Sequence, residues 1–421
     1  MSPENEVVIT GLGVVSPIGI GVAAHWAAML NMRSGVRPLT QFDPVAVPLK
    51  IGAEVVGFDP KEFVKPRKSL KVMTRDIQFG VTAASMACDS AGLRAGSVDP
   101  ERMGVVIGSD MMQCEPADVA AAFRGCLVEG RFDFTRWGTA ALEQIYPLWM
   151  LKYLPNMPAC HIAIAHDARG PNNSITLGDV SSLLAITEAV RVIRRGQADL
   201  MVTGGACSRV HPTIWVRHCV GEFSRRTDDP AAACRPFDLD RDGAVHGEGA
   251  AAFVVERRGF AEARGAPILA TVAGYASTFE SRGNGKPFRG DGIRHSIREA
   301  LRSAGIAKGD VGHVNAHGLS TRRDDAAEAQ AIRAELGDVP VTAPKSVFGN
   351  LGAAGGAVEM VASVLALVEG PVPPTMNYER EDETCPVNVI RGQALRGAKP
   401  SALLLNQAST GQAAALVLTA P

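Results

Sequence analysis

The residue of this chain in the clearest chemical setting is Asp179, which lies in a turn between an apolar run and an amphipathic helix. The apolar run, Ser174 to Leu177, predicts a short strand that ends at Gly178, a residue that allows a sharp backbone turn. The helix is predicted from apolar residues at three- and four-residue steps, namely Leu183, Ile186, Val190 and Ile193. A turn at the start of a helix lies in a field that favours negative charge, so a carboxylate or a thiolate is stabilised there.

Asp179 has two interpretations, as a reacting group and as a structural residue. As a nucleophile attacking an acyl group, a carboxylate would form a mixed anhydride, which is a reactive intermediate that does not persist. Aspartate is also one of the best helix N-cap residues, and we weigh capping or an inert role above nucleophilic catalysis. Ser181 and Ser182 follow within the helix, where we expect first-turn residues rather than nucleophiles.

Composition argues against several classes of function. The 421 residues carry 43 basic and 44 acidic side chains, a net charge of -1, which gives no sign of a nucleic-acid or membrane partner. Residues 1–8 lack the pattern of a signal peptide, and no apolar stretch approaches the ~18 residues of a membrane span. The cysteines lack the spacing of a metal site, so we expect reduced thiols, a cytoplasmic location and no metal. They are Cys88, Cys114, Cys126, Cys160, Cys207, Cys219, Cys234 and Cys385.

An internal echo predicts two related halves. The Ala-rich runs 249–256 and 411–418 each close one half in the same style, and the openings 6–11 and 268–274 are both strand-like. A composition with 44 glycines and 5% aromatic residues is typical of a tightly layered α/β protein. We place the boundary where the sequence becomes charged and glycine-rich, so that residues 1–256 form the N-terminal half and residues 257–421 the C-terminal half.

Five sequence motifs are spread along the chain. They are Gly-Pro-Asn-Asn-Ser with the turn after it (170–186), the opening strand and glycine turn (8–19), Arg-Pro-Phe-Asp-Leu-Asp-Arg-Asp-Gly-Ala-Val-His-Gly-Glu-Gly (235–249), Asn-Ala-His-Gly-Leu-Ser-Thr (315–321) and Lys-Ser-Val-Phe-Gly-Asn-Leu-Gly-Ala-Ala-Gly-Gly (345–356). Together they resemble the β-ketoacyl-acyl-carrier-protein synthases, the condensing enzymes of fatty acid and polyketide synthesis. The resemblance implies the thiolase-like duplicated fold, an α/β fold layered α-β-α-β-α.

The resemblance also implies a catalytic set, with departures at the reacting centre. Counted without gaps, the family's nucleophilic Cys falls on Asp179. His317 matches the first active-site histidine and Lys345 is kept, and we expect Lys345 to pair with Glu328. The second histidine becomes Asn350, whose amide can still donate a hydrogen bond to a developing oxyanion.

The resemblance implies that five further residues contact the acyl substrate. Met111 and Met112 line or plug the acyl tunnel, although core packing is an equal alternative for them. Thr321 and Phe348, inside the two C-terminal motifs, are carried over as substrate-binding residues. Ser409 stands where the family has a gating Phe, so we expect a more open or more polar pocket.

Without a thiol in the turn, the chain resembles the chain-length-factor subunits of type II polyketide synthases, which are ketosynthase-like partners that lack the Cys. We therefore predict a degenerate ketosynthase homologue that pairs with an active ketosynthase. One alternative is altered chemistry on the same scaffold, with His317 and Asn350 decarboxylating a malonyl carrier or transferring another acyl group, or Asp179 acting as a general base. Another is a homodimer that binds acyl groups without reacting.

The predicted partners are thus an acyl carrier protein and a ketosynthase subunit or a second copy, with no cofactor, no nucleic acid and no membrane. Carrier proteins are acidic, and residues 61–75 are rich in basic side chains. A solvated charged face explains these basic residues equally well. They are Lys61, Lys65, Arg67, Lys68, Lys71 and Arg75.

Overall fold

The computed structural model describes residues 6–44, 48–94, 96–218, 221–281 and 288–421. Cys219, counted above among the expected thiols, lies outside the described residues. A twelve-stranded mixed sheet runs through the molecule. Its strands are β1 (Val7–Ser16), β2 (Gly19–Ile20), β5 (Met103–Gly108), β8 (Asn172–Ile175), β9 (Leu200–Ser208), β10 (Glu248–Arg257), β11 (Ala270–Phe279), β12 (His313–Asn315), β13 (Pro340–Thr342), β14 (Asn388–Val389), β15 (Ser401–Gln407) and β16 (Gln412–Thr419).

The order of the strands repeats on the two sides of the contact between β1 and β11, with one additional strand, β14, at the edge of the C-terminal side. From β1 outward it runs β10, β9, β5 and β8, and from β11 outward it runs β16, β15, β12, β13 and β14. On each side the inner pairs are antiparallel and the outer pairs are parallel. The two strand-like openings and the two Ala-rich runs of the sequence therefore occupy matching places. This arrangement confirms the predicted duplicated fold.

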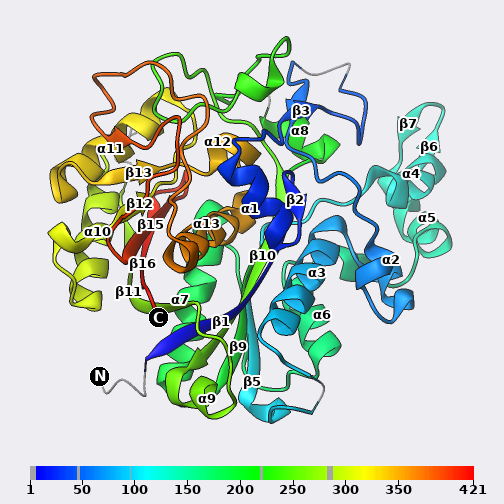
Figure 1. Cartoon of the computed structure of the whole chain (residues 1–421). Coiled ribbons are helices and arrows are strands. Elements are labelled where there is room, and N and C mark those ends of the chain that lie inside the picture. Colours follow the sequence, from blue (N-terminus) through cyan, green and yellow to red (C-terminus); the bar gives the residue numbers. More distant parts are fainter. Residues whose placement is uncertain (1–5, 45–47, 95, 219–220, 282–287) are drawn as a thin grey trace.

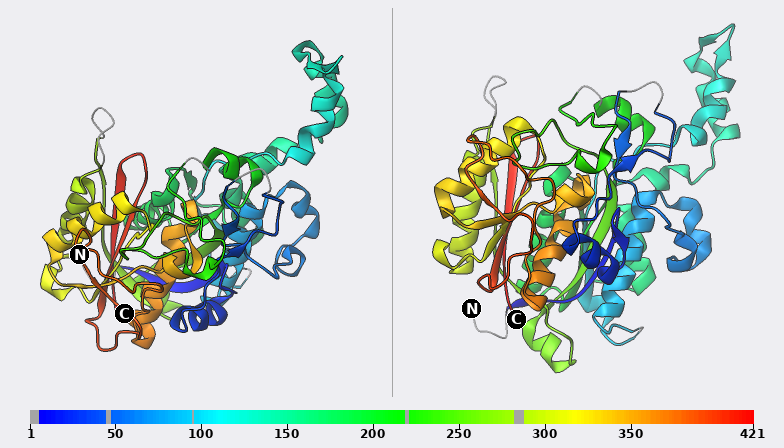
Figure 2. Two further views of the ribbon diagram at one scale, coloured as in Figure 1. Left: turned by 90° about the horizontal axis from the view of Figure 1, so that it is seen from above. Right: turned by 45° about the horizontal axis from the view of Figure 1, so that its top comes forward.

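Helices complete the five layers (Figures 1 and 2). Helices α7 (Ser181–Arg194) and α13 (Gly355–Glu369) lie in the middle and contact strands of both halves. Helices α3 (Arg75–Ser90) and α6 (Met157–His166) cover the outer face of the N-terminal half. Helices α10 (Asp291–Ala304) and α11 (Arg322–Leu336) cover the outer face of the C-terminal half. The predicted order α-β-α-β-α is confirmed, whereas the division at residue 256 stays a prediction because one sheet crosses it.

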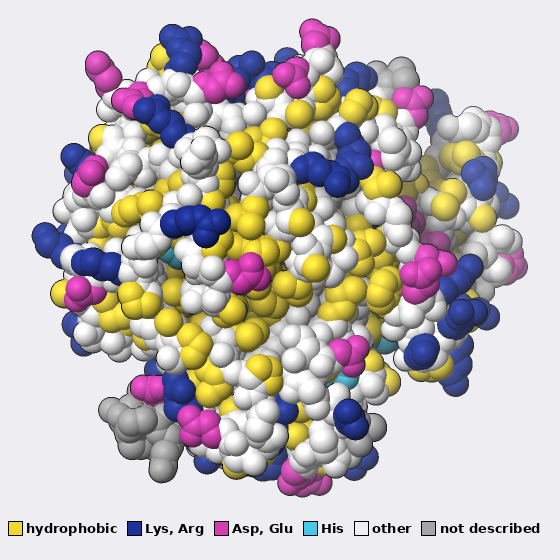
Figure 3. Space-filling model, in the orientation of Figure 1, with side chains coloured by type: hydrophobic (Ala, Val, Ile, Leu, Met, Phe, Trp, Pro, Cys, Tyr) yellow, Lys and Arg dark blue, Asp and Glu magenta, His cyan; other side chains and the backbone are white. Residues whose placement is uncertain are grey.

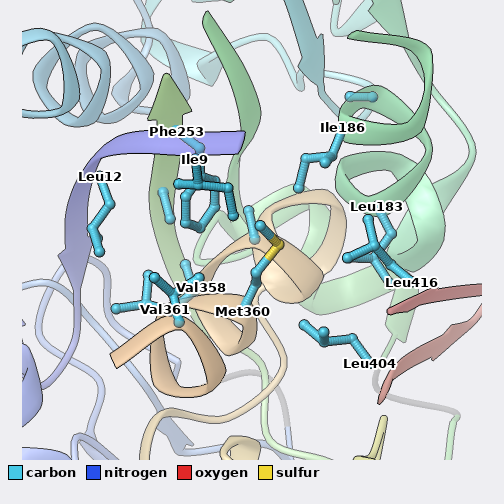
Figure 4. Close-up of a cluster of buried hydrophobic side chains, with 14 of the residues drawn as sticks. Ile9, Leu12, Leu183, Ile186, Phe253, Val358, Met360, Val361, Leu404 and Leu416 are labelled. Atoms are coloured by element: carbon cyan, nitrogen blue, oxygen red, sulfur yellow. The ribbon is translucent and has the colours of Figure 1, made fainter. Parts of the chain in front are cut away.

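The largest apolar cluster fills the middle layer (Figure 4). It joins Phe253 of β10 and Leu416 of β16 to Leu183 on α7 and Met360 on α13, all with at most 1% exposure. Burying one such side chain contributes about 1.5–3 kcal/mol, so this layer fixes α7, and with it the turn at Asp179. The segment Gly352–Glu369 is apolar and long enough to cross a membrane by composition, contrary to our expectation, but 83% of it is buried inside the molecule.

The other elements lie around these layers. They are α1 (Val22–Leu30), β3 (Arg37–Pro38), β4 (Ile51–Gly52), α2 (Pro60–Phe63), α4 (Pro116–Gly125), β6 (Leu127–Val128), β7 (Arg131–Phe132), α5 (Trp137–Gln144), α8 (Pro212–His218), α9 (Arg258–Ala263) and α12 (Lys345–Phe348). The segment from α4 to α5, which we call the arm, projects away from the body of the molecule (Figure 2).

Candidate functional site

The turn that carries Asp179 is built as the sequence predicts. Strand β8 ends at Ile175, Gly178 has a φ of 62°, and α7 begins at Ser181. The hydroxyl of Ser181 closes this turn, because Oγ accepts the N–H of Leu177 at 2.8 Å and donates to the carbonyl of Gly178 at 2.6 Å. Ser182 Oγ accepts the N–H of Ala357 at 3.0 Å. Both serine hydroxyls are therefore engaged by the backbone, in agreement with a structural role.

Asp179 is held by an ion pair rather than used as a cap. Its Oδ1 lies 3.1 Å from Nη1 of Arg209, and its side chain is only 12% exposed. The geometry is that of an ion pair without a directed hydrogen bond, since Oδ1 has no hydrogen-bond partner among the described residues. Burial alone would raise the pKa of Asp179, but Arg209, followed by His317, Lys345 and Asn350, brings that pKa down to about 2.

The expected capping role of Asp179 is wrong. The N-cap position of α7 is taken by Val180, whose side chain accepts no hydrogen bond. Within the described part of the chain, the short turn Gly178–Val180 likewise begins without a side-chain cap. The carboxylate pairs with the buried cation of Arg209, and this tertiary contact overrides the local preference of aspartate for helix starts.

Arg209 is the residue that sequence reasoning missed. It follows β9, and its Nη2 also lies 3.4 Å from Oδ2 of Asp110, which follows the neighbouring strand β5. Burial would lower the pKa of Arg209, but Asp179, Cys207 and Asp110 raise it overall, so the guanidinium is always charged. Gly352 faces this side chain with a φ of 57°, and a Cβ there would lie 2.5 Å from Nε of Arg209.

His317 belongs to a buried polar network in the C-terminal half. Lys345 Nζ lies 3.1 Å from its Nδ1, and Asn406 Nδ2 lies 3.2 Å from the same nitrogen. Burial, followed by the charge of Lys345, holds the pKa of His317 well below its usual range, so the imidazole is neutral. Because Lys345 can only donate, Nδ1 is the acceptor and Nε2 carries the proton. Nε2 has no partner among the described residues, which leaves it as a free donor.

The expected pair between Glu328 and Lys345 is not made. Lys345 instead forms an ion pair with Glu359 of α13, which also accepts a 2.9 Å hydrogen bond from Asn406 Nδ2. Glu328 accepts the backbone N–H groups of His317 at 2.7 Å and of Gly318 at 2.8 Å. Its role is thus to hold the loop that carries the histidine.

Asn350 connects the two groups of polar residues. Its Oδ1 accepts the N–H of Gly352 at 3.0 Å, and its side chain is one of the groups that lower the pKa of Asp179. Asn350 therefore contributes to the surroundings that keep Asp179 ionised.

A pocket of about 460 Å³ opens beside the turn, and Asp179 and Arg209 both line it. Of the residues carried over to the substrate, Met111 and Ser409 also line this pocket and are exposed. Met112 packs half-buried against the apolar cluster of α3, and Thr321 and Phe348 are buried. The substrate roles of all five residues stay predictions. Among the described residues that line the pocket, His317, Lys345 and Asn350 are not found.

A thiol does lie at the foot of this pocket. Cys207, at the end of β9, lines it but is only 1% exposed. Burial raises the pKa of Cys207 well above its usual value, and Asp110 and Asp76 add to the shift. The group is therefore a protonated thiol, which is a poor nucleophile. Within the described ranges, no three His, Cys, Asp or Glu side chains are grouped so that they could hold a metal ion.

Comparison with known proteins finds similar sequences along most of the chain. Two family models match, described as beta-ketoacyl synthase N-terminal domain over residues 4–261 and beta-ketoacyl synthase C-terminal domain over residues 269–379. The chain is 36% identical to the 3-oxoacyl-(acyl-carrier-protein) synthase 2 of Coxiella burnetii over 397 residues, which cover 93% of this chain and 92% of that protein. It is 34% identical to the tetracenomycin polyketide synthase ketoacyl synthase alpha subunit of Streptomyces glaucescens over 432 residues, with 99% and 98% covered.

Solved structures are similar along nearly the whole chain. The ishigamide ketosynthase/chain length factor has a TM-score of 0.87 at 29% identity, with 99% of each chain covered. A type II PKS acyl-carrier protein in complex with its ketosynthase bound to the hexaketide has a TM-score of 0.84 at 30% identity, again with 99% of each chain covered.

Proposed function

The chain belongs to the beta-ketoacyl synthase family of fatty acid and polyketide synthesis, and from that premise we propose that it is a non-condensing subunit that pairs with an active ketosynthase. It acts as a chain length factor does, by bounding the acyl tunnel of its partner, in the cytoplasm and on acyl groups brought by a carrier protein. The similarity to the ishigamide ketosynthase/chain length factor supports this role.

The observation that carries the proposal is the ion pair between Asp179 and Arg209. A nucleophile for thioesters must be free to attack and must form a lasting acyl bond, as a thiolate does. Asp179 is instead paired with a buried cation, which together with other nearby groups keeps its pKa low. The carboxylate that stands in place of the thiol is thus engaged within the protein, which suits a subunit retained for its shape.

Two features suit a second ketosynthase-type subunit as the partner. Among the strands of the described residues, β8 is the last at its end of the sheet, which suits pairing of its outer edge with another chain. The arm and the segment just after it expose large apolar side chains, which mark an interaction surface when they are grouped. They include Phe123 at 48%, Phe134 at 75%, Leu142 at 88% and Met150 at 57% exposure.

A basic surface near α2 supports the carrier protein as the second partner. Lys61, Lys65, Arg67, Lys68 and Lys71 are exposed there. Figure 3 shows a group of Lys and Arg side chains at the right of the molecule, over α2 and the segment after it. Such a group attracts an acidic protein over distances of about 10 Å at moderate salt.

The proposal is tested by co-expression with a Cys-containing ketosynthase from the same genome. We expect a stable one-to-one mixed dimer by native mass spectrometry, and no acyl adduct on this chain after incubation with an acyl carrier substrate. Peptide mapping checks position 179 and Cys207 separately. A lasting adduct on either residue, or a homodimer that never exchanges with the ketosynthase, would contradict the proposal.

A second candidate function rests on the free Nε2 donor of His317. A hydrogen bond to the thioester carbonyl of a malonyl group stabilises the enolate that forms when carbon dioxide leaves. In that case the purified chain alone decarboxylates a malonyl carrier protein, and His317→Ala abolishes the reaction. The neutral state of His317 and its contact with Lys345 favour this role, whereas its absence from the described pocket lining opposes it.

A further inference from the structure

We infer that Arg209 and Asp179 together form a partition between the pocket and His317, so that Arg209 is as much a cause of the lost reaction as the missing thiol. The inference deepens the proposed function and rests on it in one respect, because it takes the native chain to be unable to condense. It concerns how the reacting centre is closed, whichever partner the chain has.

Arg209 is fixed on three sides at the foot of the pocket. Its guanidinium lies between Asp179 on the turn and Asp110 beyond β5, at 3.1 and 3.4 Å. On the third side it packs against Gly352, where even a methyl group would lie 2.5 Å from Nε. Its side chain is 12% exposed, so one edge reaches the pocket while the rest is enclosed.

Asp179 belongs to two compartments at once. On one side it lines the pocket together with Arg209 and Cys207. On the other side its turn, Gly178–Val180, contacts the short turn Gly352–Ala354 and the helix α13, and His317 and Lys345 lie close enough to help lower its pKa. His317 itself is 1% exposed and, in the described part of the chain, is not among the residues that line the pocket. The ion pair thus has the pocket on one side and the surroundings of His317 on the other, which is the arrangement that a partition requires.

This geometry distinguishes the inference from a simple loss of the nucleophile. A thiol introduced by Asp179→Cys would face the pocket and lie near the cation of Arg209, which favours the thiolate. Attack on an acyl carrier would form a bond between that sulfur and the carbonyl carbon, and break the bond to the carrier's sulfur, which leaves as a thiol. Acylation is thus restored, but the path to His317 stays closed while Arg209 is present.

The first test measures access to His317 without relying on activity. Diethyl pyrocarbonate labelling, mapped by peptide mass spectrometry, is compared between the native chain and Asp179→Ala/Arg209→Ala, which removes one buried charge of each sign. We expect no label on His317 in the native chain and full labelling in the variant. Asp110→Asn is the matched control, since it keeps the ion pair and should stay unlabelled. If the double variant does not fold, Asp179→Asn/Arg209→Val, which keeps more buried volume, replaces it.

The second test measures chemistry with a malonyl carrier protein. Asp179→Cys/Arg209→Ala should decarboxylate it about 100-fold faster than Asp179→Cys, the effect of gaining one oxyanion donor. Asp179→Cys/Asp110→Asn, which keeps Arg209, should remain as slow as Asp179→Cys. Equal rates in all three variants, or a folded double variant with His317 unlabelled, would overturn the partition. An active or acylated native chain would overturn the proposed function instead, so the two failures are distinguishable.

Discussion

Nη1 of Arg209 lies 3.1 Å from Oδ1 of Asp179, the residue that stands where the sequence resemblance predicts a nucleophile. The carboxylate is therefore a partner in a buried ion pair, and its counterpart follows the next strand in the sequence, β9, which lies two places away from β8 in the sheet. Removing either partner leaves an uncompensated charge in a place that water reaches poorly. This relationship leads to the first of four predictions.

Asp179→Asn should lower the free energy of unfolding by about 3 kcal/mol, because it leaves the buried Arg209 with Asp110 alone. The Asp110 side chain is 31% exposed, so Asp110→Asn should cost about 1 kcal/mol or less. Urea denaturation of the two variants and the native chain measures both changes. Equal losses of unfolding free energy in the two variants would show that the ion pair of Arg209 with Asp179 stabilises the chain no more than its pair with Asp110 does.

The stability of the chain should depend on pH through Glu328. Burial raises the pKa of Glu328 to about 8, against a usual value of 4.5, although two backbone N–H groups oppose the shift. The folded state thus binds this proton more tightly than the unfolded state does. The stabilisation is complete below pH 4.5 and is lost as the pH rises through 8.

Glu328→Gln removes this titration and provides the comparison. The difference in unfolding free energy between the native chain and the variant should fall by roughly 1–2 kcal/mol from about pH 6.5 to about pH 8.5. Other buried groups titrate in both proteins and cancel in the difference. A difference that is constant over this range would mean that Glu328 is already ionised in the folded chain.

The arm should carry the contact with the ketosynthase subunit. Phe134 and Leu142 are 75% and 88% exposed, so Phe134→Glu and Leu142→Glu should leave the unfolding free energy of the isolated chain within about 0.5 kcal/mol. Both should abolish co-purification with the co-expressed ketosynthase. Val368→Glu, at a 49% exposed position near the end of α13, is the control outside the arm and should still co-purify. Retention of the partner by both arm variants would place the interface elsewhere.

Charge reversal on the basic surface should weaken the binding of the carrier protein. Lys65→Glu/Lys68→Glu changes two exposed residues near α2, and we expect about tenfold weaker binding at low salt, with the difference fading at high salt. Lys308→Glu changes an exposed lysine in the C-terminal half and serves as the control. Isothermal titration calorimetry with an acyl carrier protein measures the binding of the native chain and of both variants. An equal effect of Lys308→Glu would mean that the loss of binding comes from net charge and not from the basic surface.

The fold and the local parts of the site could be predicted because their signals are local. The turn at Gly178, the helix after it and the paired Ala-rich strands follow from glycine placement and apolar periodicity. The partner of Lys345 was wrong because a lysine side chain can reach several carboxylates, and Glu359 lies on the central helix beside it. Packing decided that choice, and spacing along the chain does not encode it.

Arg209 could not be predicted for the same physical reason. It meets Asp179 because β9 lies next to β5, which in turn lies next to β8, and this order is a property of the assembled sheet. An arginine after a buried strand is ordinarily read as a surface residue. Asp179 does not cap the helix for a related reason, since an ion pair with buried Arg209 is stronger than hydrogen bonds to a few backbone N–H groups.

The close approach of Gly352 to Arg209 restricts what position 352 can hold. A Cβ there would lie 2.5 Å from Nε of Arg209, so a larger residue would displace the guanidinium that pairs with Asp179. The φ of 57° at Gly352 disfavours other residues as well. The charge pair beside the pocket therefore depends on a glycine from a third segment of the chain.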